Sequence, residues 1–257
     1  MKIYIIGTGK VATLLGKMLV KCGHRPLGIS GRNEKIVNSL SKLLGCQSYH
    51  SITDLPANGD IYFIAVKDDA IGIVSKSLKH VKGALIHTSG ATPLTTIGRK
   101  TGAGVFYPVS TIRENFPKSL KKVPLCLEAT DEATMKKLGI LATALSNKIY
   151  LLDSGERARL HLAAVFTNNF TNHLLGIAMN LLDEKHLPAE LLEYLAVSTV
   201  RNAFENGAIE SQTGPAVRND TRTIQRQLKA LKSDKQAYEI YKLITNQLLR
   251  VHKKPKI

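Results

Sequence analysis

The segment KIYIIGTGKVATLLGKML, residues 2–19, joins an apolar run to a glycine turn and then to an amphipathic stretch. The run Ile3–Ile6 predicts a buried strand, and apolar side chains recur after the turn at helical spacing, at Leu14, Leu15, Met18 and Leu19. Between the two lies Gly-x-Gly-x-x-Ala, from Gly7 to Ala12. This order of strand, turn and helix is typical of dinucleotide-binding folds.

The small residues of the turn have distinct physical roles. Gly7 permits the tight bend, Gly9 lets a pyrophosphate approach the backbone, and Ala12 allows close packing of helix against strand. Free N–H groups and the positive end of the helix dipole favour an anion at this point. We therefore predict that the turn residues hold a dinucleotide: Gly7, Thr8, Gly9, Lys10 and Val11.

The composition is that of an ordinary globular protein, with 257 residues, 44% hydrophobic and 22% charged. No apolar run approaches the ~20 residues that span a bilayer, and the first strand follows Met1 too closely for a signal peptide. The three cysteines, Cys22, Cys46 and Cys126, lack metal-binding or redox spacing. We expect a cytoplasmic protein without a metal site or membrane segment.

The formal net charge of +16 raises the question of nucleic-acid binding. The excess is spread over both halves of the chain, with basic runs at residues 118–122 and 252–256. Only the terminal run is dense. We therefore predict that the positive field attracts an anionic cofactor or substrate, and that nucleic acid is not a partner.

Strand and helix patterns alternate along the first 153 residues. Strands are predicted at residues 25–30, 60–66, 84–87, 104–106, 123–128 and 149–152. Helices are predicted at 33–44, with Asn33 as its N-cap, at 69–78 and at about 131–145. Such alternation predicts an α/β fold with a doubly wound, mainly parallel sheet. We assign residues 1–153 to a Rossmann domain.

Residues 154–257 show helical patterns and no convincing strand. The first predicted helix runs from Glu156 to Leu182, well beyond the ~11–12 residues of an average helix. Long helices with little core of their own often pack against a second subunit. We predict an all-α domain for substrate binding and homodimerisation.

The end of the second strand bears on the choice between NAD and NADP. NAD-binding domains usually place Asp or Glu there, to bond the ribose 2′-hydroxyl. This chain has Ser30-Gly31-Arg32-Asn33 and no carboxylate before Glu34. A hydroxyl and a planar guanidinium suit a phosphate, so we predict NADP(H) bound by Ser30, Arg32 and Asn33. Alternatively, Arg32 is a solvated loop residue.

Residues 1 to about 110 resemble the NADP-binding domain of the superfamily of pyrroline-5-carboxylate reductases, deazaflavin-dependent NADP oxidoreductases and β-hydroxyacid dehydrogenases. This resemblance rests on the glycine turn, the Ser30–Asn33 loop and residues 60–67. The whole chain resembles more closely an uncharacterised bacterial family with a Rossmann-like N-terminal domain and a helical C-terminal domain of unknown function. This closer resemblance rests on residues 87–91, 106–108, 159–163, Asn168 and residues 214–220.

The superfamily resemblance implies that Ala65, Val66 and Lys67 lie beside the adenosine and ribose of the cofactor. Pyrroline-5-carboxylate reductases usually have Lys-Pro there, whereas this chain has Lys67-Asp68-Asp69. That difference weakens any transfer of their substrate.

Polar residues also follow two later strands. Because ligands bind beyond the carboxyl ends of such strands, we expect His87 and Thr88 to bond cofactor or substrate near the nicotinamide. Ser89 is predicted to position the substrate or, alternatively, to cap a short helix. Tyr107 leaves the next strand toward the same edge and is an expected substrate contact or, alternatively, an ordinary turn residue.

On the long helix, His161, Val165, Asn168 and Asn172 follow helical spacing and predict one stripe, which Arg157 extends by a turn. By resemblance, β-hydroxyacid dehydrogenases carry a catalytic lysine and asparagine on the equivalent helix, but no lysine occurs here. We predict His161 as general acid, because imidazoles titrate near neutrality, and Asn168 as a positioning residue. Alternatively, His161 is structural.

The loop at residues 214–220 offers one further cation. Arg218 is predicted to clamp a carboxylate or phosphate of the substrate. In the alternative, the loop is an ordinary turn before a helix that Asp220 caps.

Together these residues predict an NADP(H)-dependent oxidoreductase. We expect hydride transfer between the nicotinamide and a small anionic imine, carbonyl or hydroxy-acid substrate, bound between the two domains. The alternative is a non-catalytic NADP(H)-binding sensor or partner-binding protein, because no lysine or cysteine stands out as a catalytic group.

Overall fold

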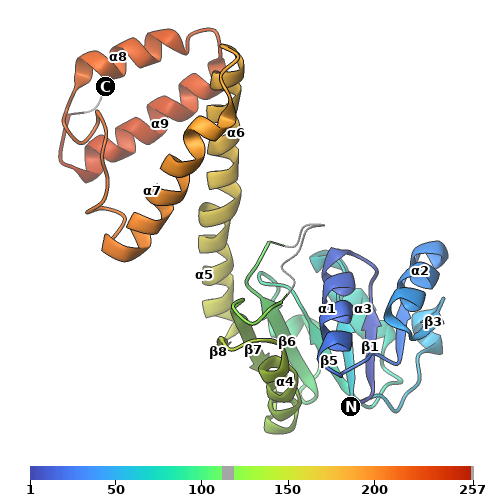
Figure 1. Cartoon of the computed structure of the whole chain (residues 1–257). Helices are drawn as coiled ribbons and strands as arrows, with labels where there is room; N and C mark the ends of the chain where they lie inside the picture. The colour runs from blue at the N-terminus through green and yellow to red at the C-terminus, as the bar shows by residue number, and fades with distance from the viewer. Residues whose placement is uncertain (112–118, 256–257) are drawn as a thin grey trace. The chain divides into compact units, whose positions relative to one another are not determined.

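The computed structural model describes residues 1–111 and 119–255 (Figure 1). Lys118 and Lys256, which belong to the two basic runs, lie outside these residues. The chain divides into two compact units, Met1–Phe170 and Thr171–Ile257. The first unit includes the start of the predicted long helix, and the domain boundary after residue 153 stays a prediction.

The described part of the first unit contains one eight-stranded sheet in the order β3-β2-β1-β4-β5-β6-β7-β8. The strands are β1 (Ile3–Ile6), β2 (Gly28–Ser30), β3 (Gln47–Tyr49), β4 (Ile61–Ile64), β5 (Ala84–His87), β6 (Ala103–Pro108), β7 (Leu125–Ala129) and β8 (Ile149–Leu151). Neighbours pair in parallel except β6 and β7, which are antiparallel. The predicted doubly wound, mainly parallel sheet is confirmed. The order of the strands changes direction between the neighbours β1 and β4.

Successive side chains of each strand point to opposite faces of the sheet, and helices bury both faces. Ile3 and Ile5 pack on one face with α1 (Lys10–Lys21), α2 (Glu34–Leu44) and α4 (Glu132–Leu145). Tyr4 and Ile6 pack on the other face with α3 (Ile71–Ser77). The short 3₁₀ helices are η1 (Ile52–Asp54), η2 (Asp68–Ala70) and η3 (Leu94–Ile97). The unbroken apolar strands of the sequence thus become the middle layer of the unit.

The described residues of the second unit form helices joined by turns and loops, with no strand among them, as predicted. It contains α6 (Thr171–Asp183), η5 (Ala189–Leu192), α7 (Glu193–Asn206), α8 (Thr221–Ala230) and α9 (Lys235–Val251). Asp220 caps α8 by accepting the N–H of Thr223 at 3.0 Å, and Asp234 caps α9 in the same way from Ala237 at 3.0 Å. Among the described helices, none has the length and hydropathy of a membrane span.

The predicted helix from Glu156 to Leu182 is not one continuous α-helix. It consists of α5 (Ser154–Ala164), the π-helical turn η4 (Val165–Phe170) and α6. A π-helix bonds i to i+5, so each residue advances less around the axis than in an α-helix. The predicted single stripe is therefore wrong beyond Val165, because Asn168 and Asn172 are rotated from their α-helical positions.

Asp131 joins the start of α4 to the start of β6. Its carboxylate accepts the N–H of Thr134 at 2.8 Å and the N–H of Gly102 at 2.6 Å. These two backbone donors, the largest causes, lower the pKa of Asp131 from 3.8 to about 2. The charged carboxylate is thus favoured by folding.

We expect Asp131→Ala to lower the free energy of unfolding by about 1 kcal/mol at neutral pH, the usual effect of losing an N-cap. Because the folded pKa is depressed, this stabilisation is present above the unfolded pKa of 3.8 and is lost as the pH falls toward about 2. Urea unfolding from neutral to acid pH measures the difference between the two proteins, with Asp54→Ala as an exposed control. A difference that does not shrink in acid would show that the charge is not its source.

Candidate active site

The glycine turn lies against the end of β4. Gly7 has a φ of +120°, and a Cβ at this position would lie 2.1 Å from the carbonyl oxygen of Ala65. The N–H of Gly7 donates to the carbonyl of Ser30 at 2.8 Å. Only glycine fits both the backbone angle and the close approach. The turn therefore brings together the ends of β1, β2 and β4.

The N-terminus of α1 is open to an anion. Gly9 is its N-cap, no side chain among residues 1–111 and 119–255 caps it, and its first turn carries no acidic residue. By contrast, Asp or Asn side chains cap five other helices, α2, α4, α5, α8 and α9. A Cβ at Gly9 would meet no atom within 4 Å. The unused N–H groups and the helix dipole thus fit a pyrophosphate.

The loop after β2 lies beside this turn. A Cβ at Gly31 would lie 2.8 Å from the Cγ2 of Thr8. Arg32 is exposed, and Asn33 caps α2 by accepting the N–H of Ile36 at 3.2 Å, as the sequence predicts. The Ser30 hydroxyl is buried and has no hydrogen-bond partner among the described residues.

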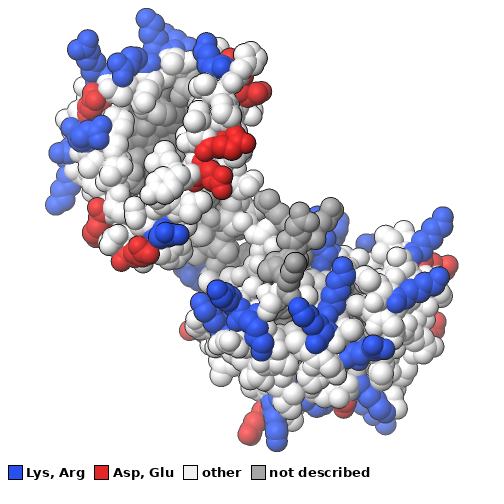
Figure 2. Space-filling view, viewed as in Figure 1, with Lys and Arg blue, Asp and Glu red and all other residues white. Residues whose placement is uncertain are grey.

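The segment after β4 completes this edge. Ala65 and Val66 follow the strand, and the Val66 side chain would lie 3.5 Å from a Cβ at Gly7. Lys67 is exposed and precedes η2. Lys10 is also exposed, and Lys and Arg side chains outnumber acidic ones on the face of the first unit that Figure 2 shows. The residues predicted for the cofactor thus include three exposed cations, Lys10, Arg32 and Lys67.

His87, the last residue of β5, is fully buried. Its Nδ1 accepts the N–H of Ser89 at 3.2 Å. Burial, and then the charge of Arg157, lower the pKa of His87 to about 3. The imidazole is therefore neutral at physiological pH, and the hydrogen-bond pattern assigns its proton to Nε2. The adjacent Thr88 is half-buried.

Ser89 closes a turn rather than capping a helix. Its Oγ accepts the N–H groups of Ala91 and Thr92 at 3.2 and 3.0 Å. The next helix, η3, begins only at Leu94 and has Pro93 as its N-cap. The predicted helix cap is wrong because the backbone bends at this point without continuing into helical turns.

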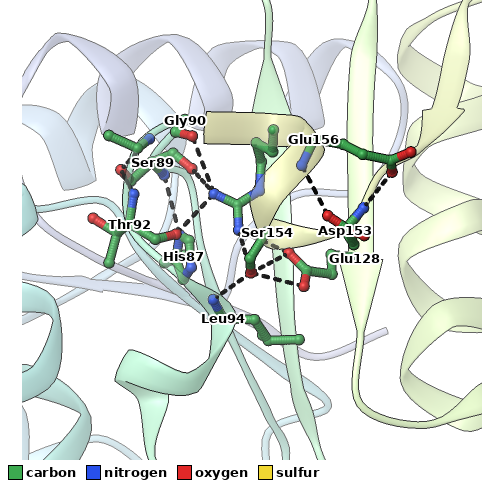
Figure 3. A network of polar contacts seen from close by, with 11 residues as sticks. His87, Ser89, Gly90, Thr92, Leu94, Glu128, Asp153, Ser154 and Glu156 are labelled. Atoms are coloured by element: carbon green, nitrogen blue, oxygen red, sulfur yellow. Dashed lines mark hydrogen bonds and ion pairs between the residues drawn. The ribbon is translucent and has the colours of Figure 1, made fainter. Parts of the chain in front are cut away.

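Arg157 holds this turn from α5 (Figure 3). It is the largest fully buried side chain in the described residues, and its Nη2 lies 2.7 Å from the Oε2 of Glu128 on β7. Its Nη1 donates to three carbonyls, those of Ser89, Gly90 and Thr92, at 3.1, 3.2 and 2.7 Å. Sequence analysis missed this role, because an arginine in a polar helical turn usually faces solvent; its place one turn before His161 was the available signal.

Tyr107 and His161 meet beside the same turn. The Oη of Tyr107 lies 3.2 Å from the Nδ1 of His161. A Cβ at Gly90 would lie 2.6 Å from the Cζ of Tyr107 and 2.7 Å from the Nδ1 of His161, so only glycine fits against this pair. Burial, and then Cys126, raise the pKa of Tyr107. The phenol therefore keeps its proton at neutral pH and can donate it.

The other two predicted catalytic residues, Asn168 and Arg218, are exposed. Asn168 is exposed on η4, and its amide donates to the Oδ1 of Asn169 at 3.2 Å. Arg218 is exposed in the second unit, before α8. The structure thus brings Ser89 and His161 together around Gly90, while the roles of Asn168 and Arg218 stay predictions. Within residues 1–111 and 119–255, no three His, Cys, Asp or Glu side chains are grouped to hold a metal ion.

Comparison with known families follows the same division of the chain. Residues 2–87 match the family described as NADP oxidoreductase, coenzyme F420-dependent, and residues 123–248 match DUF2520, a domain of unknown function. The chain is also similar to the structure of a candidate NADP oxidoreductase from Bacteroides fragilis. That likeness has 30% identity and a TM-score of 0.88, over 97% of this chain and 98% of the other. The chain belongs to the family of NADP oxidoreductases with a C-terminal DUF2520 domain.

More distant structures share the fold of this NADP oxidoreductase family. An imine reductase from Myxococcus stipitatus in complex with NADP⁺ is 15% identical, with a TM-score of 0.70, over 98% of this chain and 93% of the other. A pyrroline-5-carboxylate reductase from Coxiella burnetii is 18% identical, with a TM-score of 0.54, over 98% and 97%. No curated protein matches the sequence. The predicted family, fold and NADP-dependent oxidoreductase class are confirmed.

Proposed function

We propose that this chain reduces the C=N or C=O bond of a small anionic substrate, with NADPH as cofactor and with Tyr107 and His161 as the source of the proton. The contact of 3.2 Å between the Tyr107 Oη and the His161 Nδ1 carries the proposal. The pair lies beside the turn that follows β5, and ligands of such sheets bind beyond the carboxyl ends of the strands. Family membership favours this enzyme over the alternative of a non-catalytic NADP(H) sensor.

The cofactor would be held by the edge that the glycine turn organises. The N-terminus of α1 and the turn residues Gly7–Val11 would bind its pyrophosphate. The loop Ser30–Asn33 would bind the 2′-phosphate, and residues Ala65–Lys67 the adenosine and ribose. Thr88, next to the buried His87, would contact the region near the nicotinamide. When bound, NADPH supplies the hydride.

The protein side of the reaction is proton delivery and orientation. Tyr107, kept protonated by burial, donates to the nitrogen or oxygen of the substrate, and His161 returns a proton to the phenolate through its Nδ1. Ser89 and Asn168 would orient the substrate by hydrogen bonds. Arg218, exposed in the second unit, stays the predicted clamp for a carboxylate or phosphate.

We further propose a homodimer, with a second copy covering the apolar surface of α6 and α7. No side chain of either helix is buried. Yet the two helices expose large hydrophobic side chains: Leu174, Met179, Leu181, Tyr194, Leu195, Val197, Val200 and Phe204. Isolated helices of this length are marginal in water, and monomers rarely expose apolar patches larger than a few hundred Å².

Arg32→Ala tests the assignment of the 2′-phosphate. We expect the Kd for NADPH to rise about tenfold or more, because a charge-assisted bond to a phosphate is worth roughly 1.5–3 kcal/mol, while the Kd for NADH stays the same. Fluorescence titration of both coenzymes measures the two constants. Lys35→Ala removes a nearby exposed cation as the matched control. An unchanged ratio of the two constants in Arg32→Ala would refute the assignment.

Tyr107→Phe and His161→Gln test the proton source. We expect each to lower kcat by roughly 10²–10⁴-fold, the usual contribution of a general acid, with little change in the Kd for NADPH. The assay follows NADPH absorbance with cyclic imines, 2-oxo acids and β-hydroxy acids, and His173→Gln is the exposed histidine control. Full activity in both variants would contradict the proton source, and tight NADPH binding without any turnover in the wild type would contradict the reductase.

Sedimentation velocity at micromolar concentration tests the homodimer. We expect twice the chain mass of 28.1 kDa. Phe204→Glu, at a side chain that is 80% exposed, should shift the protein toward the monomer, because it places a charge in the apolar surface. Glu205→Gln, an exposed neighbour on α7, is the control. A wild-type protein that sediments at the mass of one chain would exclude the proposal.

A further inference from the structure

We propose that Arg157 and Glu128 are positioning residues of this enzyme. Their ion pair, between the buried Arg157 and the half-buried Glu128, holds the turn Ser89–Thr92 so that Gly90 supports the Tyr107–His161 pair. The catalytic consequence rests on the proposed function, whereas the holding of the turn does not.

The guanidinium is directed at one short segment of backbone. Its Nη1 faces the carbonyls of Ser89, Gly90 and Thr92, between 2.7 and 3.2 Å away. Figure 3 shows these contacts converging from one side, while Glu128 and Ser154 lie on the other. A planar guanidinium can serve several acceptors in fixed directions, which a lysine cannot.

Ser154 fixes the far end of the same segment. Its Oγ donates to Glu128 at 2.8 Å, accepts the N–H of Leu94 at 2.9 Å and lies 3.1 Å from the Arg157 Nη2. The segment from Ser89 to Leu94 is therefore tied at both ends to β7 and α5.

Gly90 connects the held turn to the Tyr107–His161 pair by direct contact. The position of its missing Cβ lies 2.6 Å from the Tyr107 ring and 2.7 Å from the His161 Nδ1, so the two side chains rest directly on the Gly90 backbone. A shift of this backbone has to alter the 3.2 Å contact between Tyr107 and His161.

An ion pair with a buried partner, such as Arg157, adds little to the free energy of unfolding. Apolar residues of similar volume are often equally stable, because burying two charges costs desolvation energy. Moreover, the Arg157 Nε is buried and has no hydrogen-bond partner among the described residues. The arrangement is instead suited to fixing the geometry of one turn.

Hydrogen exchange of the full-length protein tests the holding of the turn. The amides of Ser89, Ala91, Thr92 and Leu94 all donate to side chains of this network, so they report on its order. In Arg157→Lys and in the milder Glu128→Gln we expect about tenfold faster exchange in residues 88–94, with β4 unchanged. Arg159→Lys, an exposed arginine on the same helix, should match the wild type.

The ¹⁵N resonance of the His161 Nδ1, assigned with His161→Gln, tests transmission to the pair without any substrate. We expect it to move in Arg157→Lys and Glu128→Gln and to stay in Arg159→Lys. Unchanged exchange in residues 88–94, faster exchange throughout the first unit, or an unmoved His161 resonance would each overturn the proposal.

Turnover is then compared with these readouts. We expect kcat to fall about tenfold in Arg157→Lys at an unchanged Kd for NADPH, and a full kcat with a loosened turn would also overturn the positioning role. A wild type that reduces no substrate refutes the proposed function, and exchange and resonance still decide whether the ion pair places Tyr107 and His161.

Discussion

The first unit depends on the close approach of the Gly7 backbone to the carbonyl of Ala65. No side chain fits between them, since a Cβ would lie 2.1 Å from that oxygen. Because of this contact, β1 and β4 end at the same level and α1 starts directly above the turn. The same backbone that closes the sheet thereby leaves the first N–H groups of α1 free for an anion. The fold and the proposed cofactor site therefore depend on the same steric constraint.

Near β7, an ion pair fixes the backbone, whereas at Gly7 a close steric contact does so. The antiparallel strand β7 carries Glu128, and α5 carries Arg157 to meet it at 2.7 Å. Glu128 and Arg157 together fix the turn Ser89–Thr92 after β5, and Tyr107 and His161 pack against Gly90 of this turn. The candidate chemistry thus depends on three segments that lie far apart in the sequence: the turn after β5, the strand β7 and the helix α5. The π-helical turn η4 follows directly on α5, and such turns are frequent at functional sites.

Much of the fold was predictable because its signals are local. The Gly7–Ala12 turn lies between a strand and a helix that each carry their own periodicity. Asn33 was predicted as an N-cap, and Asp220 in one of the two interpretations of its loop, since each precedes its helix directly. Both caps are present. The π-helical turn was not predicted, because the apolar spacing around Val165 is equally compatible with a continuous α-helix.

The sequence by itself determined the Rossmann topology and the helical second unit, and it predicted an NADP site after β2. Glycine spacing, apolar periodicity and a missing carboxylate are all properties of neighbouring residues. Only the tertiary structure decided which polar side chains meet. It turned Ser89 into the closure of a turn, buried Arg157 against Glu128 and brought Tyr107 to His161. The physical reason is that an arginine or a tyrosine has the same local pattern in solvent and in a buried network, and only packing between distant segments supplies its partner.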